Sequence, residues 1–152
     1  MIEQNGHYYF SSSDEAEEAF YAAFEECDLD IMKAVYAEKD VTCIHPNSFP
    51  LVGRNKVLEC WQQLFTGGFD NAFKIEILRK SISNDIAVHV VSEEVFEKHD
   101  LENRVNHVIA TNIYIHEKNG WRLMTHHASF FREGMHPTEL LNTDESDPDE
   151  LS

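Results

Sequence analysis

Four strand-like segments follow one another between residues 72 and 132, and this run limits the possible folds more than any other feature of the sequence. The segments are AFKIEILRKSIS (72–83), IAVHVVSEEVFEKH (86–99), RVNHVIATNIYIHE (104–117) and WRLMTHHASFFR (121–132). The short sequences ND, DLEN and KNG connect them as turns. Strands with such short connections pair with their neighbours in antiparallel fashion, so we expect a long, curved, mostly antiparallel sheet.

Helices are expected in the first half of the chain. In SSSDEAEEAFYAAFEEC (11–27), Ser12 and Glu15 fit a capping box and precede an apolar stripe. DLDIMKAVYAEKD (28–40) predicts a second, short helix, and RNKVLECWQQLFTGG (54–68) predicts a third that carries Trp61. Between them, VTCIHP (41–46) predicts a short strand and NSFPLVG (47–53) a loop.

This order of elements predicts an α+β domain, in which three N-terminal helices pack against one face of the sheet. A curved sheet over helices leaves a conical space open at one end, which is a natural ligand pocket. We expect the domain to span residues 13–132. The remaining residues, 133–152, contain seven acidic residues and no Lys or Arg, which is typical of a flexible acidic tail.

Composition disfavours several classes of function. The net charge of −16 would repel nucleic acids. No apolar run is long enough to predict a membrane span, and the first residues do not resemble a secretory signal. The three cysteines lack metal-binding or redox spacing, so we expect reduced thiols in a cytoplasmic protein. Motifs for zinc, nucleotides and a serine nucleophile are absent, so we expect neither a metal nor a cofactor.

Two segments resemble a known group of proteins. They are CIHPNSFPLVGRNKVLECWQQLF (43–65) and ATNIYIHEKNGWRLMTHHAS (110–129). The first resembles the strand–loop–helix segment of the nuclear-transport-factor-2-like superfamily, and especially of its SnoaL-like branch, and the second resembles its final hairpin. That hairpin is also similar to the association domain of calcium/calmodulin-dependent protein kinase II.

The resemblance implies a cystatin-like cone with a pocket, and it leaves the activity open. The superfamily includes isomerases, dehydratases, cyclases, transport factors and assembly domains. Its members usually form homodimers through the outer face of the sheet. In this sequence that face would hold an apolar row formed by Ile109, Thr111, Ile113 and Ile115.

The resemblance also singles out two residues near the expected mouth of the cone. In ketosteroid isomerases an Asp before a Pro serves as the base, and here His45 precedes Pro46. A histidine can exchange a proton near neutral pH, but without the carboxylate steroid isomerisation is not implied. Tyr21 lies on the helix from which a Tyr helps to form the oxyanion hole in those enzymes. A half-buried strand-end His45 and a core Tyr21 are the simpler structural interpretations.

The long strands supply the other candidates. Alignment with the kinase association domain places Glu93, Asn112 and Ala128 at positions where that domain has arginines, so a neutral or cationic ligand is favoured over an anion. Strand alternation sends one of His126 and His127 inward, and we predict His126 unless a bulge reverses the faces. Trp61 and Tyr114 complete the predicted pocket lining.

Two functions are compatible with these residues. One is a cofactor-independent isomerase or lyase in which His45, His126 and Glu93 transfer a proton on a small organic molecule. The other is a non-enzymatic module that binds a ligand or assembles as a homodimer. A core histidine that is simply hydrogen-bonded is the ordinary alternative for His126.

Overall fold

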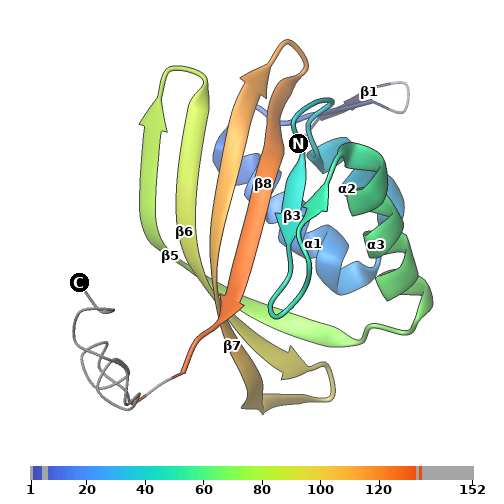
Figure 1. Ribbon diagram of the computed structural model, residues 1–152, viewed down its shortest axis with the longest axis vertical. Coiled ribbons are helices and arrows are strands. Elements are labelled where there is room, and N and C mark those ends of the chain that lie inside the picture. The colour runs from blue at the N-terminus through green and yellow to red at the C-terminus, as the bar shows by residue number, and fades with distance from the viewer. Residues whose placement is uncertain (1, 5–6, 133, 135–152) are drawn as a thin grey trace, which may run out of the picture.

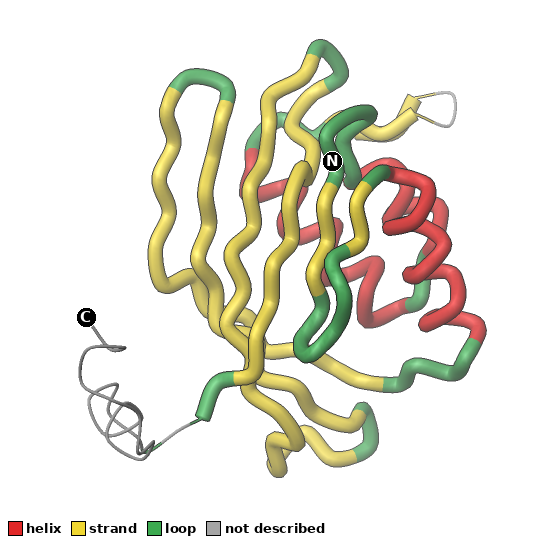
Figure 2. Tube along the Cα trace, viewed as in Figure 1, coloured by secondary structure: helices red, strands yellow, loops and turns green. Residues whose placement is uncertain are grey.

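The computed structural model describes residues 2–4, 7–132 and 134, so the expected tail lies almost entirely outside the described residues. The described part of the chain forms three α-helices and eight strands (Figures 1 and 2). The helices are α1 (Ser13–Glu26), α2 (Leu29–Val35) and α3 (Arg54–Thr66). None of the described helices is long and apolar enough to cross a membrane.

Six strands form one curved sheet in the order β4-β3-β8-β7-β6-β5. They are β3 (Thr42–Ile44), β4 (Leu51–Val52), β5 (Asn71–Ser83), β6 (Ile86–Glu97), β7 (Asp100–Glu117) and β8 (Gly120–Phe130). All pairs are antiparallel except β3–β8, which is parallel. The expected α+β class is therefore confirmed, and the three helices lie against the concave side of the sheet (Figure 2).

The first helix begins where the sequence predicts. The Ser12 side chain accepts a hydrogen bond from the backbone N–H of Glu15 at 3.1 Å. The Glu15 carboxylate reaches back to the N–H of Ser11 at 2.7 Å, one residue before the position in a standard capping box. The first bond satisfies an N–H group that a helix start leaves without a partner, and the second links the preceding residue to the first turn.

Two local predictions were wrong in detail, and one segment had no prediction. Leu51–Val52 within the predicted loop forms β4, because this apolar pair returns antiparallel to β3. DLEN is part of β7, because the chain already turns at residues 98 and 99 and pairs Glu97 with Asp100. The first ten residues, which had no predicted structure, contain a small hairpin of β1 (Ile2–Gln4) and β2 (His7–Tyr9).

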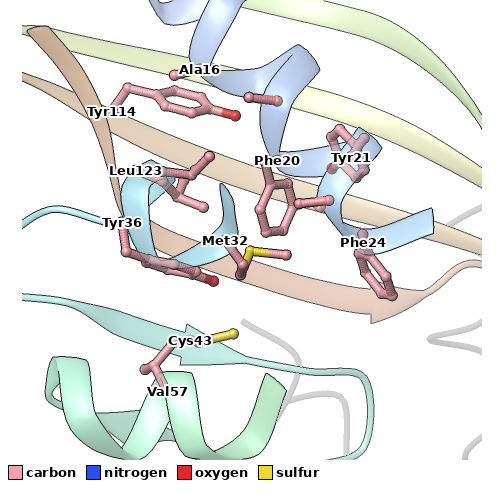
Figure 3. Close-up of a cluster of buried hydrophobic side chains, with 14 of the residues drawn as sticks. Ala16, Phe20, Tyr21, Phe24, Met32, Tyr36, Cys43, Val57, Tyr114 and Leu123 are labelled. Carbon is pink, nitrogen blue, oxygen red and sulfur yellow. The ribbon is translucent and has the colours of Figure 1, made fainter. Parts of the chain in front are cut away.

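A core of aromatic and aliphatic side chains fills the space between the helices and the sheet. Phe20 of α1 packs edge to face against Trp61 of α3, with ring centroids 5.7 Å apart. Met32 and Leu123 gather beside Phe20, and all three are fully buried (Figure 3). The helices therefore pack tightly on the part of the sheet where the sequence predicts an open cone.

Candidate functional site

Polar side chains are buried in this core. Aliphatic residues normally occupy such positions, because a buried polar group lowers stability unless it is hydrogen-bonded. The buried polar residues come from α1, β6, β7 and β8, and they are Ser13, Glu17, His89, Ser92, Glu93, Asn112 and His126. All except Ser92 join one hydrogen-bonded group, together with Tyr21 and Tyr114, and we call this group the polar network.

One half of the polar network surrounds the carboxylate of Glu17. Its Oε2 accepts from Nδ1 of His89 at 3.0 Å, from the hydroxyl of Tyr114 at 2.8 Å and from Nδ2 of Asn112 at 3.3 Å. Ser13 lies one helical turn before Glu17, and its hydroxyl is 2.9 Å from Nε2 of His89. The His89 ring therefore bridges Ser13 and Glu17.

The other half contains Glu93. Tyr21, one turn after Glu17 on α1, donates its hydroxyl to Oε2 of Glu93 at 2.5 Å. The same hydroxyl accepts from Nδ2 of Asn112 at 3.0 Å. Oδ1 of Asn112 is 2.6 Å from Nδ1 of His126. Asn112 therefore connects the two carboxylates and His126.

The amide of Asn112 sets the direction of several of these hydrogen bonds. Asn112 donates to Tyr21 and Glu17, so its oxygen faces His126 and accepts the Nδ1–H of that ring. Tyr21 then donates to Glu93. Tyr21 and Asn112 each donate to a carboxyl group, and His126, a neutral imidazole, carries its proton on Nδ1.

Burial displaces several pKa values at the site. It raises the pKa of Glu93 from the ordinary 4.5 to about 7, although the hydrogen bond from Tyr21 acts in the opposite direction. Burial, with smaller effects of His45 and His127, lowers the pKa of His126 from 6.5 to about 3. Burial and the nearby Glu93 raise the pKa of Tyr21 well above 10. Of Glu93, His126 and Tyr21, Glu93 is the one whose pKa lies near neutral pH.

His45 lies next to the polar network, outside its hydrogen bonds. It is half-buried just after β3, with its ring centroid 6.1 Å from that of His126 and 4.8 Å from that of Trp61. Burial lowers the pKa of His45 below 6.5. The three predicted catalytic residues therefore lie in one connected region, in which Asn112 and Tyr21 link His126 to Glu93.

The two neighbouring histidines face opposite sides of the sheet. His126 is 1% exposed and contacts the Phe20 ring at 5.0 Å between centroids, whereas His127 is exposed. A bulge in β8 at Met124 does change the alternation, because Ile113 pairs with Thr125 and Tyr114 with Leu123. Leu123 is buried as a result, and the faces of His126 and His127 are still as predicted.

Neither of the two cavities described next is lined by His45 or His126. The first, of about 880 Å³, lies between the β1–β2 hairpin and α2. The second, of about 600 Å³, lies between α1 and β5, and Tyr21 lines it. We call the second one the α1–β5 cavity. Trp61, Asn112 and Tyr114 are fully buried and Ala128 is 3% exposed, so these four residues lie in the packed interior.

Ser13, Glu17 and His89 were not among the predicted site residues. Ser13, Glu17 and Tyr21 are spaced four residues apart, so they form a polar line beside the apolar stripe of α1, and this spacing was the available signal. Among the described residues, no group of three or more His, Cys, Asp or Glu side chains is arranged to hold a metal ion.

Comparisons with known proteins agree with this architecture. A model of the SnoaL-like domain family matches residues 14–133. A candidate calcium/calmodulin-dependent protein kinase type II association domain from Thiobacillus denitrificans is 35% identical, with a TM-score of 0.77, and the match covers 83% of this chain and 100% of that one. A comparison with curated proteins gave no match.

Two further solved structures share the fold. A candidate dehydratase of the nuclear-transport-factor-2-like family from Streptomyces avermitilis is 26% identical, with a TM-score of 0.68, and the match covers 77% of this chain and 91% of that one. A protein with a cystatin-like fold from Nostoc punctiforme is 13% identical, with a TM-score of 0.68 and coverage of 82% and 96%, and this likeness shows the fold alone. The predicted resemblance and the cystatin-like fold are thus confirmed.

Proposed function

Because the chain belongs to the family of SnoaL-like domains, we propose that it binds a small organic molecule and transfers a proton on it, as an isomerase or a lyase does. The hydrogen bond of 2.5 Å between Tyr21 and Glu93 carries this proposal. A buried carboxyl group with a pKa of about 7 is present in both protonation states near neutral pH, which suits a general acid or base.

Tyr21 connects this carboxyl group to the α1–β5 cavity. Glu93 is only 3% exposed, whereas Tyr21 lines the cavity. A substrate in the cavity lies next to the Tyr21 ring, and a small movement of that ring gives Glu93 access to a C–H group of the substrate. In an isomerase, Glu93 returns the same proton to another atom of that molecule. In a lyase, Glu93 gives it to the leaving group.

His126 and His45 have different roles in this proposal. With a pKa of about 3, His126 stays neutral at physiological pH and holds the amide of Asn112, which in turn orients Tyr21. His126 is therefore a positioning residue. His45 is half-buried and also neutral, and it remains the candidate for a second proton carrier at the other end of the site.

The test is proton exchange at carbon, which needs no knowledge of the natural substrate. Small ketones and β-hydroxy carbonyl compounds are incubated with the protein in D₂O, and loss of the C–H signal is followed by NMR. We expect exchange with the natural chain and a loss of about 10² or more in the Glu93→Gln variant. The control is Glu94→Gln, which alters the outward-facing neighbour that pairs with Arg104. Equal rates in both variants would remove Glu93 from the mechanism.

A second candidate function is assembly as a homodimer. Ile109, Thr111, Ile113 and Ile115 lie half-buried on the outer face of β7, as an interface row would. The similarity to a candidate association domain at 35% identity supports this alternative. Assembly and catalysis use opposite faces of the sheet, so one does not exclude the other.

A further inference from the structure

The α1–β5 cavity combines an apolar strand with an acidic helix. On the β5 side, Phe73 and Ile75 are half-buried, and Ile77 is 45% exposed. The exposed apolar surface of these side chains favours a ligand with a hydrocarbon or aromatic body, because covering it releases ordered water. The volume of about 600 Å³ is in the range of small-molecule sites.

The α1 side of the cavity is strongly negative. Asp14, Glu17, Glu18 and Glu25 contribute four carboxyl groups, and Lys80 contributes the single cation, so the formal charge of the lining is −3. Lys80 is already paired with Asp14 at 2.9 Å. The whole chain carries −16, so anionic ligands are repelled and cations are attracted.

Glu17 supplies a fixed acceptor in this wall. The residue is 4% exposed, and all three of its hydrogen bonds are made by Oε2. Among the described residues none donates to Oε1, although Glu17 lines the cavity. Oε1 is not among the described side-chain atoms that are buried without a partner, so it is accessible from the cavity, where a ligand N–H group can donate to it.

From these three observations we propose that the α1–β5 cavity binds an organic cation, a protonated amine on an apolar body. The ammonium group donates to Oε1 of Glu17 and lies near the carboxylate of Glu18, while the apolar body covers Ile75 and Ile77. This inference rests on the proposed function in placing the ligand beside Tyr21, but it does not require proton transfer.

The test compares three molecules with the same hydrocarbon chain. Hexylamine, which is protonated at pH 7, is titrated against the protein by calorimetry in parallel with 1-hexanol and hexanoate. We expect hexylammonium to bind about tenfold more tightly than hexanol, because a hydrogen bond to a charged acceptor is stronger than one between neutral groups. Hexanoate should not bind. Equal affinity for hexanol or hexanoate would overturn the proposal.

Variants of α1 locate the site. Glu17→Gln should reduce the affinity for hexylammonium about tenfold or more, and Glu18→Gln about two- to fivefold, in line with an exposed ion pair. Glu26→Gln is the control, because Glu26 is exposed on the same helix and does not line the cavity. Near-ultraviolet circular dichroism shows whether Glu17→Gln folds. If it does not fold, the affinity of Glu18→Lys for hexylammonium is measured instead and should be lower than that of the natural chain. Unchanged affinity in Glu18→Lys would overturn the proposal.

The same titration separates this inference from the proposed function. Glu93→Gln should retain hexylammonium binding and lose proton exchange. If no variant or natural chain catalyses exchange while hexylammonium still binds through Glu17, the proposed reaction is wrong and the cation site remains. If exchange depends on Glu93 while hexylammonium does not bind, the cation site is wrong and the reaction remains.

Discussion

Glu93 and His126 belong to one buried network, and burial moves their pKa values in opposite directions. The pKa of Glu93 rises to about 7 and that of His126 falls to about 3. Folding therefore favours protonated Glu93, whose contribution to the free energy of unfolding is full below pH 4.5 and is lost as the pH rises to about 7. The contribution of His126 is full above pH 6.5 and is lost as the pH falls toward 3.

The two contributions oppose each other between pH 4.5 and pH 6.5, so the natural chain should show little net pH dependence from this pair. The Glu93→Gln variant should lose the contribution of Glu93 to the pH dependence of the free energy of unfolding. Relative to the natural chain, its free energy of unfolding should rise by about 2 kcal/mol from pH 5 to pH 7. Urea unfolding at both pH values measures this. A parallel pH dependence in Glu93→Gln and in the natural chain would show that Glu93 has an ordinary pKa.

At the residue scale the sequence indicated part of the site and missed another part. Glu93 and Asn112 were selected through the resemblance to the kinase association domain, and His126 was selected because strand alternation, with its period of two, places it inward; all three are buried. Glu17 was missed because a Glu on an acidic helix normally faces solvent. Glu17 reaches His89 and Tyr114 because α1 lies over β6 and β7. The sequence around Glu17 does not predict this tertiary contact.

At the element scale, periodicity and capping predicted α1 to within a residue or two of its bounds, whereas the bulge in β8 was only an open possibility. One extra residue at Met124 makes Leu123 the buried side chain, and simple alternation gives the opposite result. Bulges depend on how two strands match along their whole length. Which side chains of β8 face inward therefore depends on its pairing with β7, which the sequence alone does not give.

The start of α1 offers a second test, because this helix carries three members of the network. Ser12→Ala removes the acceptor for the N–H of Glu15 and should lower the free energy of unfolding by about 1 kcal/mol. Ser11→Ala is the matched control, since Ser11 is exposed and uses its backbone N–H to bind Glu15. Chemical unfolding of both variants measures the difference, and an equal loss in both would argue against the cap.

At the scale of the whole molecule, the order of helices and strands predicted the class of fold, because few architectures bury three amphipathic helices against one meander. The hollow expected beside His45 and His126 could not be predicted from the order of elements in the same way. Whether a cone is open depends on the sizes of facing side chains, and here Phe20, Met32 and Leu123 occupy the interior. The α1–β5 cavity lies at the edge strand instead.

The outer face of the sheet gives the last prediction. If the row of Ile109, Thr111, Ile113 and Ile115 forms a homodimer interface, light scattering at micromolar concentration should report twice the chain mass of 17.6 kDa. Ile113→Lys places a charge in the middle of that row and should give monomers, because an unpaired charge is costly to bury. Ile82→Lys, on the exposed edge strand β5, should remain dimeric. A monomeric natural chain, or a dimer that tolerates Ile113→Lys, would contradict an interface at this face.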